Sequence, residues 1–283
     1  SGSGSVTLNP PGGVYNSGAT VQLTATPAAG FQFSGWNGDL TGSTNPATLT
    51  MNANKNVTAT FTAIGGSGQI VYQETKTGAS SSSTTVTTAT NLTAIGGDLY
   101  LAAIVSRSRK AVTGVSGMGL TWTLVKAQCS GRNLTGVEVW MARGTPNGNG
   151  TVTATFALAP SNAVIAVSRY SGVNAVNAIG NIISGNTLGL NGLCSGGTDN
   201  ATYSFNFTTT ANGAVIYGAA AIRSTTHTPG AGYTERVEIV QGSSSPATVA
   251  VQEKSMTTAG TVPLNGTFGN NNDWAVVGIE LKP

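Results

Sequence analysis

The chain offers little material for acid–base chemistry, because its 283 residues include one histidine and ten carboxylates. The histidine, His227, lies in the segment Thr225–Pro229, whose threonine and proline content predicts a solvated loop. A serine nucleophile needs a histidine base and, in one large class of hydrolases, a Gly-x-Ser-x-Gly turn, which this sequence lacks. The sequence therefore predicts no catalytic triad.

Paired carboxylates are the second arrangement that could do chemistry, since glycoside hydrolysis uses two of them across a cleft. Glu235 and Glu238 are three residues apart in a segment that reads as a strand, so their side chains are expected on opposite faces. Glu138 lies in the alternating segment Val137–Ala142 and is expected to face solvent. We therefore expect that the protein is not an enzyme.

Two loops carry enough side-chain oxygen atoms to coordinate a calcium ion, which prefers several oxygen ligands. They contain Asp199 with Asn200, and the run Asn270–Asp273. Neither has the spacing of a helix–loop–helix calcium site. The sequence predicts no cofactor, and a structural calcium ion in one of these loops is left as an open alternative.

The two cysteines, Cys129 and Cys194, are far apart and form no Cys-x-x-Cys motif, which argues against a zinc or thioredoxin-like site. They indicate one disulfide in an oxidising compartment, the alternative being two buried free thiols. We therefore expect a secreted or cell-surface protein. Asn-x-Ser/Thr sequons, which are acceptor sites only in a host that glycosylates, occur at seven positions: Asn56, Asn91, Asn133, Asn149, Asn200, Asn206 and Asn265.

Basic residues are few, with 13 Lys and Arg and a net charge of +3, so the sequence predicts no nucleic-acid partner. The one basic cluster along the chain is Arg107, Arg109 and Lys110. It is either a contact for a sulfated or acidic glycan or a charged loop that keeps a sheet edge soluble, and we favour the loop. No run of 18 apolar residues occurs, so no membrane span is predicted.

The elements that must position these residues are strands. Charged residues make up 8% of the chain, against about 25% in a typical soluble domain. Glycine contributes 39 residues, and apolar residues alternate with threonine in short runs between Gly, Pro and Asn turns. The sequence predicts an all-β chain with a small antiparallel module at 1–62, a Gly/Ser linker at 63–68, and a larger β-sandwich at 69–283.

The first module contains the turn Asn9–Gly13, the alternating strand Ala19–Thr26, and the loop Gly35-Trp36-Asn37-Gly38-Asp39. Together with the final run Val57-Thr-Ala-Thr-Phe61, these motifs make residues 6–62 resemble the divergent InlB B-repeat, a small all-β module of secreted and surface-anchored bacterial proteins. The resemblance implies a spacer or stalk without catalytic residues. It also implies that Trp36 packs in the core of the module, rather than stacking on a sugar.

The larger region carries many strand-like runs, including the almost continuously apolar Leu99–Val105 and Trp274–Leu281. Such runs are typical of the central strands of a sandwich. The region predicts a single antiparallel two-sheet sandwich with a jelly-roll-like order of strands. The region also contains Gly119-Leu-Thr-Trp-Thr-Leu-Val125, Val137-Glu-Val-Trp140, Tyr170-Ser-Gly-Val173 and Trp274-Ala-Val276. Through this pattern it resembles, more loosely, an uncharacterised jelly-roll-like module of bacterial secreted and phage-structural proteins, which implies no particular activity.

Composition favours a non-catalytic structural or adhesive surface protein, because low charge removes the repulsion that blocks pairing between sheet edges. We predict a self-assembling, pilin-like fibre subunit joined by strand addition, with an N-terminal contact segment formed by Ser5, Val6, Thr7 and Leu8. The alternative is a pair of carbohydrate-binding modules that recognise an extracellular polysaccharide. Aromatic residues expected in loops, which such binding would use, are Tyr15, Tyr170 and Tyr233.

Overall fold

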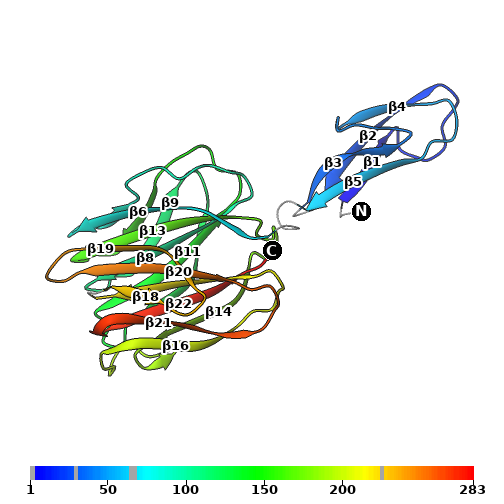
Figure 1. Ribbon diagram of the computed structural model, residues 1–283. Helices are drawn as coiled ribbons and strands as arrows, with labels where there is room; N and C mark the ends of the chain where they lie inside the picture. The colour runs from blue at the N-terminus through cyan, green and yellow to red at the C-terminus, as the bar shows by residue number, and fades with distance from the viewer. Residues whose placement is uncertain (1–3, 29–30, 64–68, 224–225) are drawn as a thin grey trace. The chain divides into compact units, whose positions relative to one another are not determined.

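The computed structural model describes residues 4–28, 31–63, 69–223 and 226–283, and every regular element in these ranges is a β-strand (Figure 1). The prediction of an all-β chain is confirmed. The chain divides into two compact units, one comprising Ser1–Ser67 with Asn174–Val176 and the other Gly68–Val173 with Asn177–Pro283. Apart from Ala63, the predicted linker at 63–68 lies outside the described residues.

The first unit consists of five strands in two antiparallel sheets. One sheet has the order β1-β2-β4 and the other pairs β3 with β5. In β2 alternate side chains are buried, as its sequence pattern predicts, and Val21, Leu23 and Ala25 form the core with Trp36 and Phe61. The strands are β1 (Gly4–Asn9), β2 (Ala19–Pro27), β3 (Phe31–Gly38), β4 (Ala47–Met51) and β5 (Val57–Ala63).

Trp36 lies in this core with 3% of its surface exposed, and its Nε1 donates a hydrogen bond to the carbonyl of Thr44 at 2.9 Å. A buried indole needs a partner for its N–H, and this contact supplies one. The core role expected for Trp36 is therefore confirmed.

The second unit begins with eight strands that form a complete sandwich. A five-stranded sheet of order β10-β11-β8-β13-β6 covers a three-stranded sheet of order β7-β12-β9. Their shared core includes Tyr100, Trp122 and Phe156. The strands are β6 (Val71–Ser81), β7 (Thr85–Thr87), β8 (Leu99–Arg107), β9 (Val112–Gly117), β10 (Trp122–Cys129), β11 (Thr135–Arg143), β12 (Val152–Phe156) and β13 (Asn162–Ser171).

The remaining strands form a second sandwich, with sheet orders β15-β14-β22-β17-β20-β19 and β16-β21-β18. Its core includes Tyr203, Phe207 and Trp274. The strands are β14 (Ile179–Asn186), β15 (Gly189–Leu190), β16 (Asn200–Thr208), β17 (Val215–Ile222), β18 (His227–Pro229), β19 (Thr234–Gln241), β20 (Ala247–Ser255), β21 (Thr261–Asn272) and β22 (Trp274–Leu281).

The two sandwiches have the same topology. When the short β15 is set aside, the strands β6 to β13 correspond in chain order to β14 and β16 to β22, and every pairing in the first sandwich recurs in the second. Each has eight strands in two sheets with the order of a jelly roll, except that the fifth strand pairs with the sixth. The larger unit therefore holds two tandem jelly-roll-like sandwiches, where the sequence suggested one.

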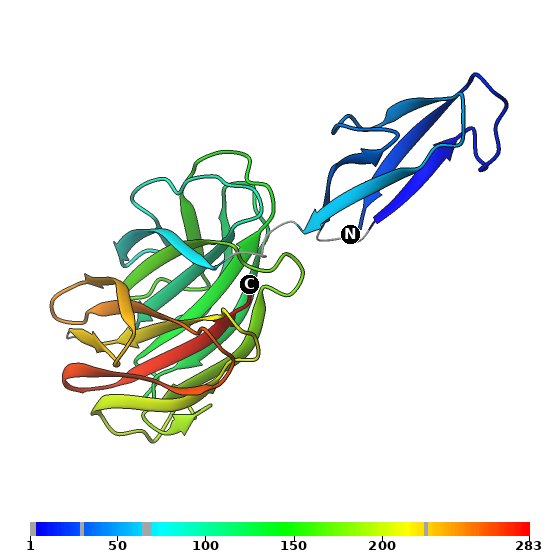
Figure 2. The same cartoon turned by 45° about the vertical axis from the view of Figure 1, so that its right-hand side comes forward.

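The two large sheets pack against each other, which gives the second unit four layers (Figure 2). The contacts are reciprocal, since β11 packs on β17 and β22 while its counterpart β20 packs on β8 and β13. This is the pattern of a symmetric dimer within one chain. Because both faces of each central sheet are covered, β8, β13, β17 and β22 are buried almost throughout, which explains their continuous apolar sequences.

Candidate functional site

The predicted contact segment, Ser5 to Leu8, lies in β1 at the edge of the sheet β1-β2-β4. One side of β1 is paired with β2 in the same chain, in the register Val6 opposite Ala25 and Leu8 opposite Leu23. Ser5, Val6 and Thr7 are exposed, and Leu8 is half-buried. The segment is therefore an edge strand of its own module, with one backbone edge already in use.

The direction of the free backbone groups of β1 follows from the hydrogen bonds of Ala25. Its N–H donates to Asn45 Oδ1 at 2.9 Å, and its carbonyl accepts from Asn45 Nδ2 at 2.8 Å, so both groups point to the β4 side of β2. Ala25 and Val6 are thus a pair without mutual hydrogen bonds, and the N–H and C=O of Val6 point away from β2. Leu8, two residues further on, has the same orientation.

An apolar groove lies beside this edge. It has a volume of about 220 Å³ and is lined by side chains from β1, β2, β4, β5 and the loops that join them. Val6, whose exposed fraction is 40%, and Leu8 form part of its wall with Tyr15 and Met51. The predicted contact residues therefore reach both an unpaired backbone edge and an open apolar surface.

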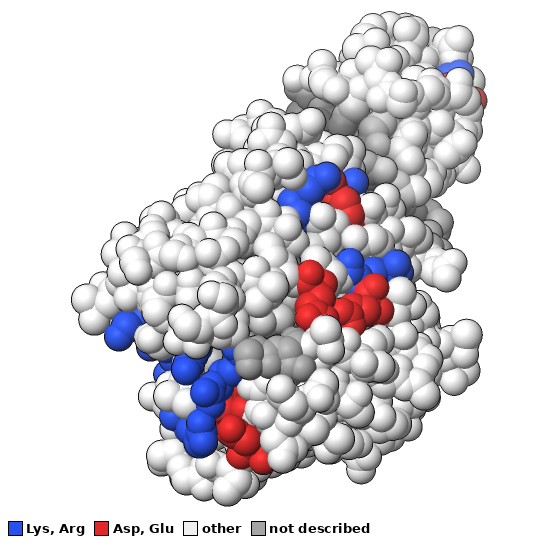
Figure 3. Space-filling model, turned by 60° about the vertical axis from the view of Figure 1, so that its left-hand side comes forward, with Lys and Arg blue, Asp and Glu red and all other residues white. Residues whose placement is uncertain are grey.

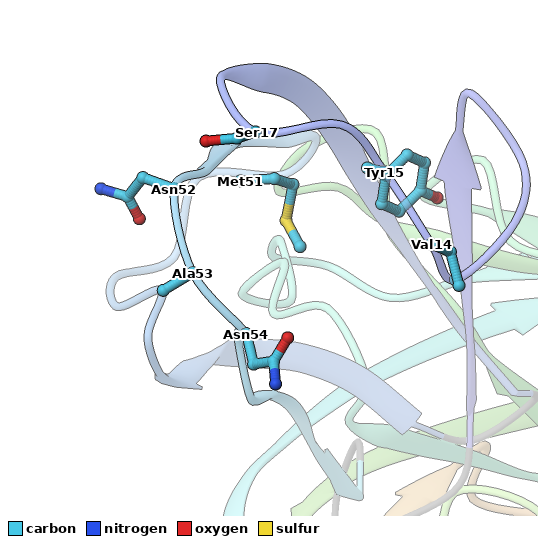
Figure 4. A pocket seen from close by; sticks show the side chains of 8 residues that line it. Val14, Tyr15, Ser17, Met51, Asn52, Ala53 and Asn54 are labelled. Atoms are coloured by element: carbon cyan, nitrogen blue, oxygen red, sulfur yellow. The ribbon is translucent and has the colours of Figure 1, made fainter.

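Figure 4 shows a second, more polar pocket next to the groove, formed where the β1–β2 loop faces the β4–β5 loop. Its volume is about 300 Å³. Met51 and the Asn54 amide point into the space, and Tyr15 stands on the opposite side, while Asn52 points outward. The Tyr15 hydroxyl donates to the carbonyl of Pro10 at 2.8 Å, which fixes the ring. An aromatic ring and an amide are groups that bind sugars.

The surface of the first unit is almost free of charge, as the space-filling view indicates (Figure 3). Asp39 and Lys55 are the charged residues of its sequence, and they lie 3.8 Å apart as an ion pair. In the second unit, by contrast, edge strands of the large sheets carry charges, such as Lys126 on β10 and Glu235 and Glu238 on β19. Charged edges oppose pairing with other chains, and β1 has no such protection.

The histidine prediction is wrong, because His227 is buried in the second sandwich and not in a solvated loop. Its Nδ1 lies 2.9 Å from Glu235 Oε2, and its Nε2 lies 2.9 Å from the Tyr203 hydroxyl, which also accepts from Gln252. The arrangement resembles an acid–base relay. Burial, however, raises the pKa of Tyr203 well above its usual range, so the phenol stays protonated and enclosed. The cluster ties four strands together.

Glu235 and Glu238 are also not on opposite faces. The register of β19 against β20 shifts between Glu235 and Val237, and this bulge brings both carboxylates to His227. Glu238 Oε2 accepts the backbone N–H of His227 at 3.0 Å. Burial, together with the nearby charge of Glu235, raises the pKa of Glu238. A bulge adds one residue to a strand, so the side chains beyond it lie on the face of the sheet opposite to the one that simple alternation predicts.

Three further side chains differ from expectation. Glu138 is buried and accepts hydrogen bonds from the Val112 N–H and Trp140 Nε1. Tyr170, expected in a loop, lies within β13 in the core between the large sheets, where its hydroxyl donates to Glu253 at 2.7 Å. Tyr233 is buried as well. The loop aromatics therefore do not form a common platform, and Tyr15 is the member that lines a pocket.

Cys129 and Cys194 form a disulfide, with their Cα atoms 5.5 Å apart. The oxygen-rich loops next to it are engaged by protein donors. Asp273 accepts from Ser130 Oγ at 2.6 Å and from the Arg132 N–H at 3.1 Å, and Asn200 Oδ1 accepts from Trp274 Nε1. Among the residues that the structure describes, no group of three or more His, Cys, Asp and Glu side chains is arranged to hold a metal ion.

The sequons are distributed over the first unit and both sandwiches of the second unit, and their occupancy stays a prediction. Asn200 and Asn265 are half-buried, and the side chains of the other five are exposed: Asn56, Asn91, Asn133, Asn149 and Asn206. Within the described ranges, no helix is long and apolar enough to cross a membrane.

Comparison with known proteins identifies the first unit. Residues 1–65 match the divergent InlB B-repeat domain. No curated protein and no solved structure matches the chain, and nothing identifies the family of the larger unit. The match and the disulfide suggest a bacterial protein of the cell surface or extracellular space that carries an InlB B-repeat at residues 1–65.

Proposed function

We propose that the protein is a non-catalytic structural or adhesive protein of the bacterial surface, and that copies of it join by strand addition at β1. The observation that carries this proposal is the outward-pointing backbone of Val6 and Leu8 on an edge strand without charge or proline. Unpaired N–H and C=O groups on such an edge are a template for another strand.

The groove beside β1 gives the proposed strand addition a source of specificity, which backbone pairing alone does not provide. In strand addition the main-chain hydrogen bonds give affinity, and pockets for alternate side chains give specificity. Val6, Leu8, Tyr15 and Met51 offer an apolar wall of this kind next to the free edge. The net charge of the first unit is zero, since Asp39 and Lys55 balance each other, so two copies approach without electrostatic repulsion.

The partner strand comes from a second copy of the chain. Growth into a fibre requires that the added strand comes from a different surface than β1, because pairing of β1 with β1 closes into a dimer. We propose the open, head-to-tail form. Negative-stain electron microscopy of the concentrated protein is then expected to show filaments, whereas dispersed monomers or closed dimers contradict the fibre.

Proline at position 6 tests the edge directly. Val6→Pro removes an N–H that points away from β2, so the β1–β2 ladder of the module is preserved while the template is broken. Val6→Thr is the matched control, since it keeps the N–H and the branched side chain. We expect filaments from the wild type and from Val6→Thr and none from Val6→Pro. Filaments of equal length from all three proteins would refute the proposal.

Carbohydrate binding is the second candidate function, and the pocket in Figure 4 is the observation that favours it. A sugar stacked on Tyr15 would receive hydrogen bonds from Asn54 at the opposite wall. A glycan array with the wild type and Tyr15→Ala tests this. A hit that disappears in the variant supports sugar binding, and an array without hits rejects it.

A further inference from the structure

We propose that one end of the second unit, where Arg107, Arg132 and Arg223 converge, binds the sulfate or carboxylate group of an acidic polysaccharide. This proposal is independent of strand addition, since it concerns a different unit of the chain. Figure 3 shows a cluster of basic side chains on this unit, bordered by acidic ones.

The arginines come from three separate segments. Arg107 ends β8, Arg132 lies in the turn between β10 and β11, and Arg223 directly follows β17. Arg132 Nε lies 3.5 Å from Asp199 Oδ1, and Arg223 Nη1 lies 3.8 Å from Asp199 Oδ2. Burial lowers the pKa of Arg107, the nearby charges of Arg223 and Arg132 lower it further, and the charge of Asp273 raises it. Arg132 and Arg223 thus flank Asp199, and Arg107 lies close enough for both of their charges to act on it.

Positive charge exceeds negative charge at this place. Arg109 contacts the same turn, because its Nη1 donates to the side chain of Asn133, next to Arg132, at 3.2 Å. Asp199 and Asp273 are the carboxylates that interact with the three converging arginines. Asp273 has no exposed surface, and its two oxygens accept hydrogen bonds from the β10–β11 turn. Three guanidinium groups thus meet two carboxylates, one of which is enclosed.

The hydrogen bonds of the arginines are incomplete as well. Arg107 donates from Nη1 to the carbonyl of Leu134 at 2.8 Å, but its Nε is enclosed without an acceptor. The Nε of Arg223 is in the same situation. Each guanidinium has five N–H donors, and a bound oxyanion accepts from several of them at once. Because these two Nε–H groups are enclosed, a bound anion would accept from the other N–H donors of the guanidinium groups and offset their positive charge.

The backbone under the site is fixed. The disulfide between Cys129 and Cys194 ties the strand that leads into the Arg132 turn to the loop that carries Asp199. The Gly197 N–H donates to the carbonyl of Gly131 at 3.0 Å and holds the same two segments together. A site whose side chains rise from fixed segments loses less entropy on binding a ligand.

The duplicated fold explains how two of the arginines meet. In the strand correspondence of the two sandwiches, the last residue of β8, Arg107, is equivalent to Arg223 at the end of β17. Because the two large sheets pack reciprocally, the equivalent ends of β8 and β17 lie at the same end of the unit. A pair of equivalent arginines at one end can hold an anion from both sides.

The chemistry of the arginine side chains limits the chemical class of the ligand. Arginine forks match the planar or tetrahedral geometry of carboxylate and sulfate. Three arginines are too few for the extended phosphate contacts of a nucleic acid. An extracellular protein meets such acidic groups mainly on polysaccharides, so a sulfated or uronic-acid polymer is the ligand that we assign.

Isothermal titration calorimetry of the full chain tests the assignment with four probes: a heparin-derived tetrasaccharide, a tetragalacturonate, inorganic sulfate and neutral maltotetraose. The variants are Arg132→Gln and Arg223→Gln, with Lys282→Gln as a control that removes the same charge elsewhere. We expect one of the acidic oligosaccharides to bind and each arginine variant to weaken it about tenfold, since a charged hydrogen bond is lost. The control is expected to bind like the wild type.

Three results would overturn the proposal. Neither acidic oligosaccharide binds, or inorganic sulfate binds while both oligosaccharides do not, which would indicate an adventitious ion only. The third is that Lys282→Gln weakens oligosaccharide binding as much as the arginine variants do. Thermal unfolding of each variant separates loss of binding from loss of fold. Arg132 is exposed, so its variant is expected to unfold at the wild-type temperature.

Discussion

Removal of the disulfide should destabilise the second unit and leave the first unit unchanged. The bond between Cys129 and Cys194 closes a loop with a sequence separation of 65 residues. In the chain-entropy description, a loop of this length reduces the entropy of the unfolded chain by about 14 cal/mol/K, which corresponds to about 4 kcal/mol at 25 °C. The double variant Cys129→Ala/Cys194→Ala is therefore expected to lose up to about 4 kcal/mol in its free energy of unfolding.

Urea unfolding followed by tryptophan fluorescence measures this loss. Trp36 reports on the first unit, which contains no cysteine, and Trp122, Trp140 and Trp274 report on the second. The transition of the second unit should move to lower urea concentration, while the transition of the first unit stays in place and serves as an internal control. A loss below about 1 kcal/mol, or an equal shift of both transitions, would refute the reasoning.

Three further predictions concern the second unit. Gly278→Ala should cost about 1–3 kcal/mol of its stability, measured by urea unfolding, because the new Cβ would lie 2.5 Å from Leu264 Cδ2. Asp273→Ala should cost about 1–3 kcal/mol in the same assay, since the buried Ser130 hydroxyl and the Arg132 N–H of the β10–β11 turn lose their acceptor. Glu238→Gln should change the pH profile of the melting temperature. Burial raises the pKa of Glu238, so the wild type loses stability as pH rises from about 4.5 through the raised pKa, and the variant should not show this loss. An unchanged profile would contradict that assignment.

The sequence was informative where local patterns decide the structure. Alternation in Ala19–Thr26 predicted the half-buried β2, and the continuous apolar run Leu99–Val105 predicted a central strand. The landmark Trp36 indicated the core of the first module. In each case a single strand and its burial follow from the periodicity of side chains, without knowledge of the partner strands.

The duplication escaped detection because the two sandwiches share strand order far more than residues. The equivalent strands β8 and β17 read Leu-Tyr-Leu-Ala-Ala-Ile-Val and Val-Ile-Tyr-Gly-Ala-Ala-Ala, which any buried strand could adopt. Only the sheet topology makes the repeat visible. The sequence therefore gives no sign that Arg107 and Arg223 are equivalent, although the fold brings them together.

The buried polar cluster escaped detection for a different reason. A bulge between Glu235 and Val237 breaks the strict alternation on which the facing of Glu235 and Glu238 was predicted. The segment around His227 pairs with β21, far away in sequence, and this tertiary contact buries the ring against Tyr203. Loop-like composition does not reveal such long-range pairing.

The most direct test of strand addition is hydrogen exchange of the β1 amides, measured by NMR in dilute and in concentrated protein. The amides of Val6 and Leu8 point to the free edge, whereas those of Ser5 and Thr7 face β2. We predict that Val6 and Leu8 exchange rapidly in the dilute protein and become protected on assembly, while Ser5 and Thr7 are protected in both. Rapid exchange of Val6 and Leu8 at every concentration would contradict the proposed function.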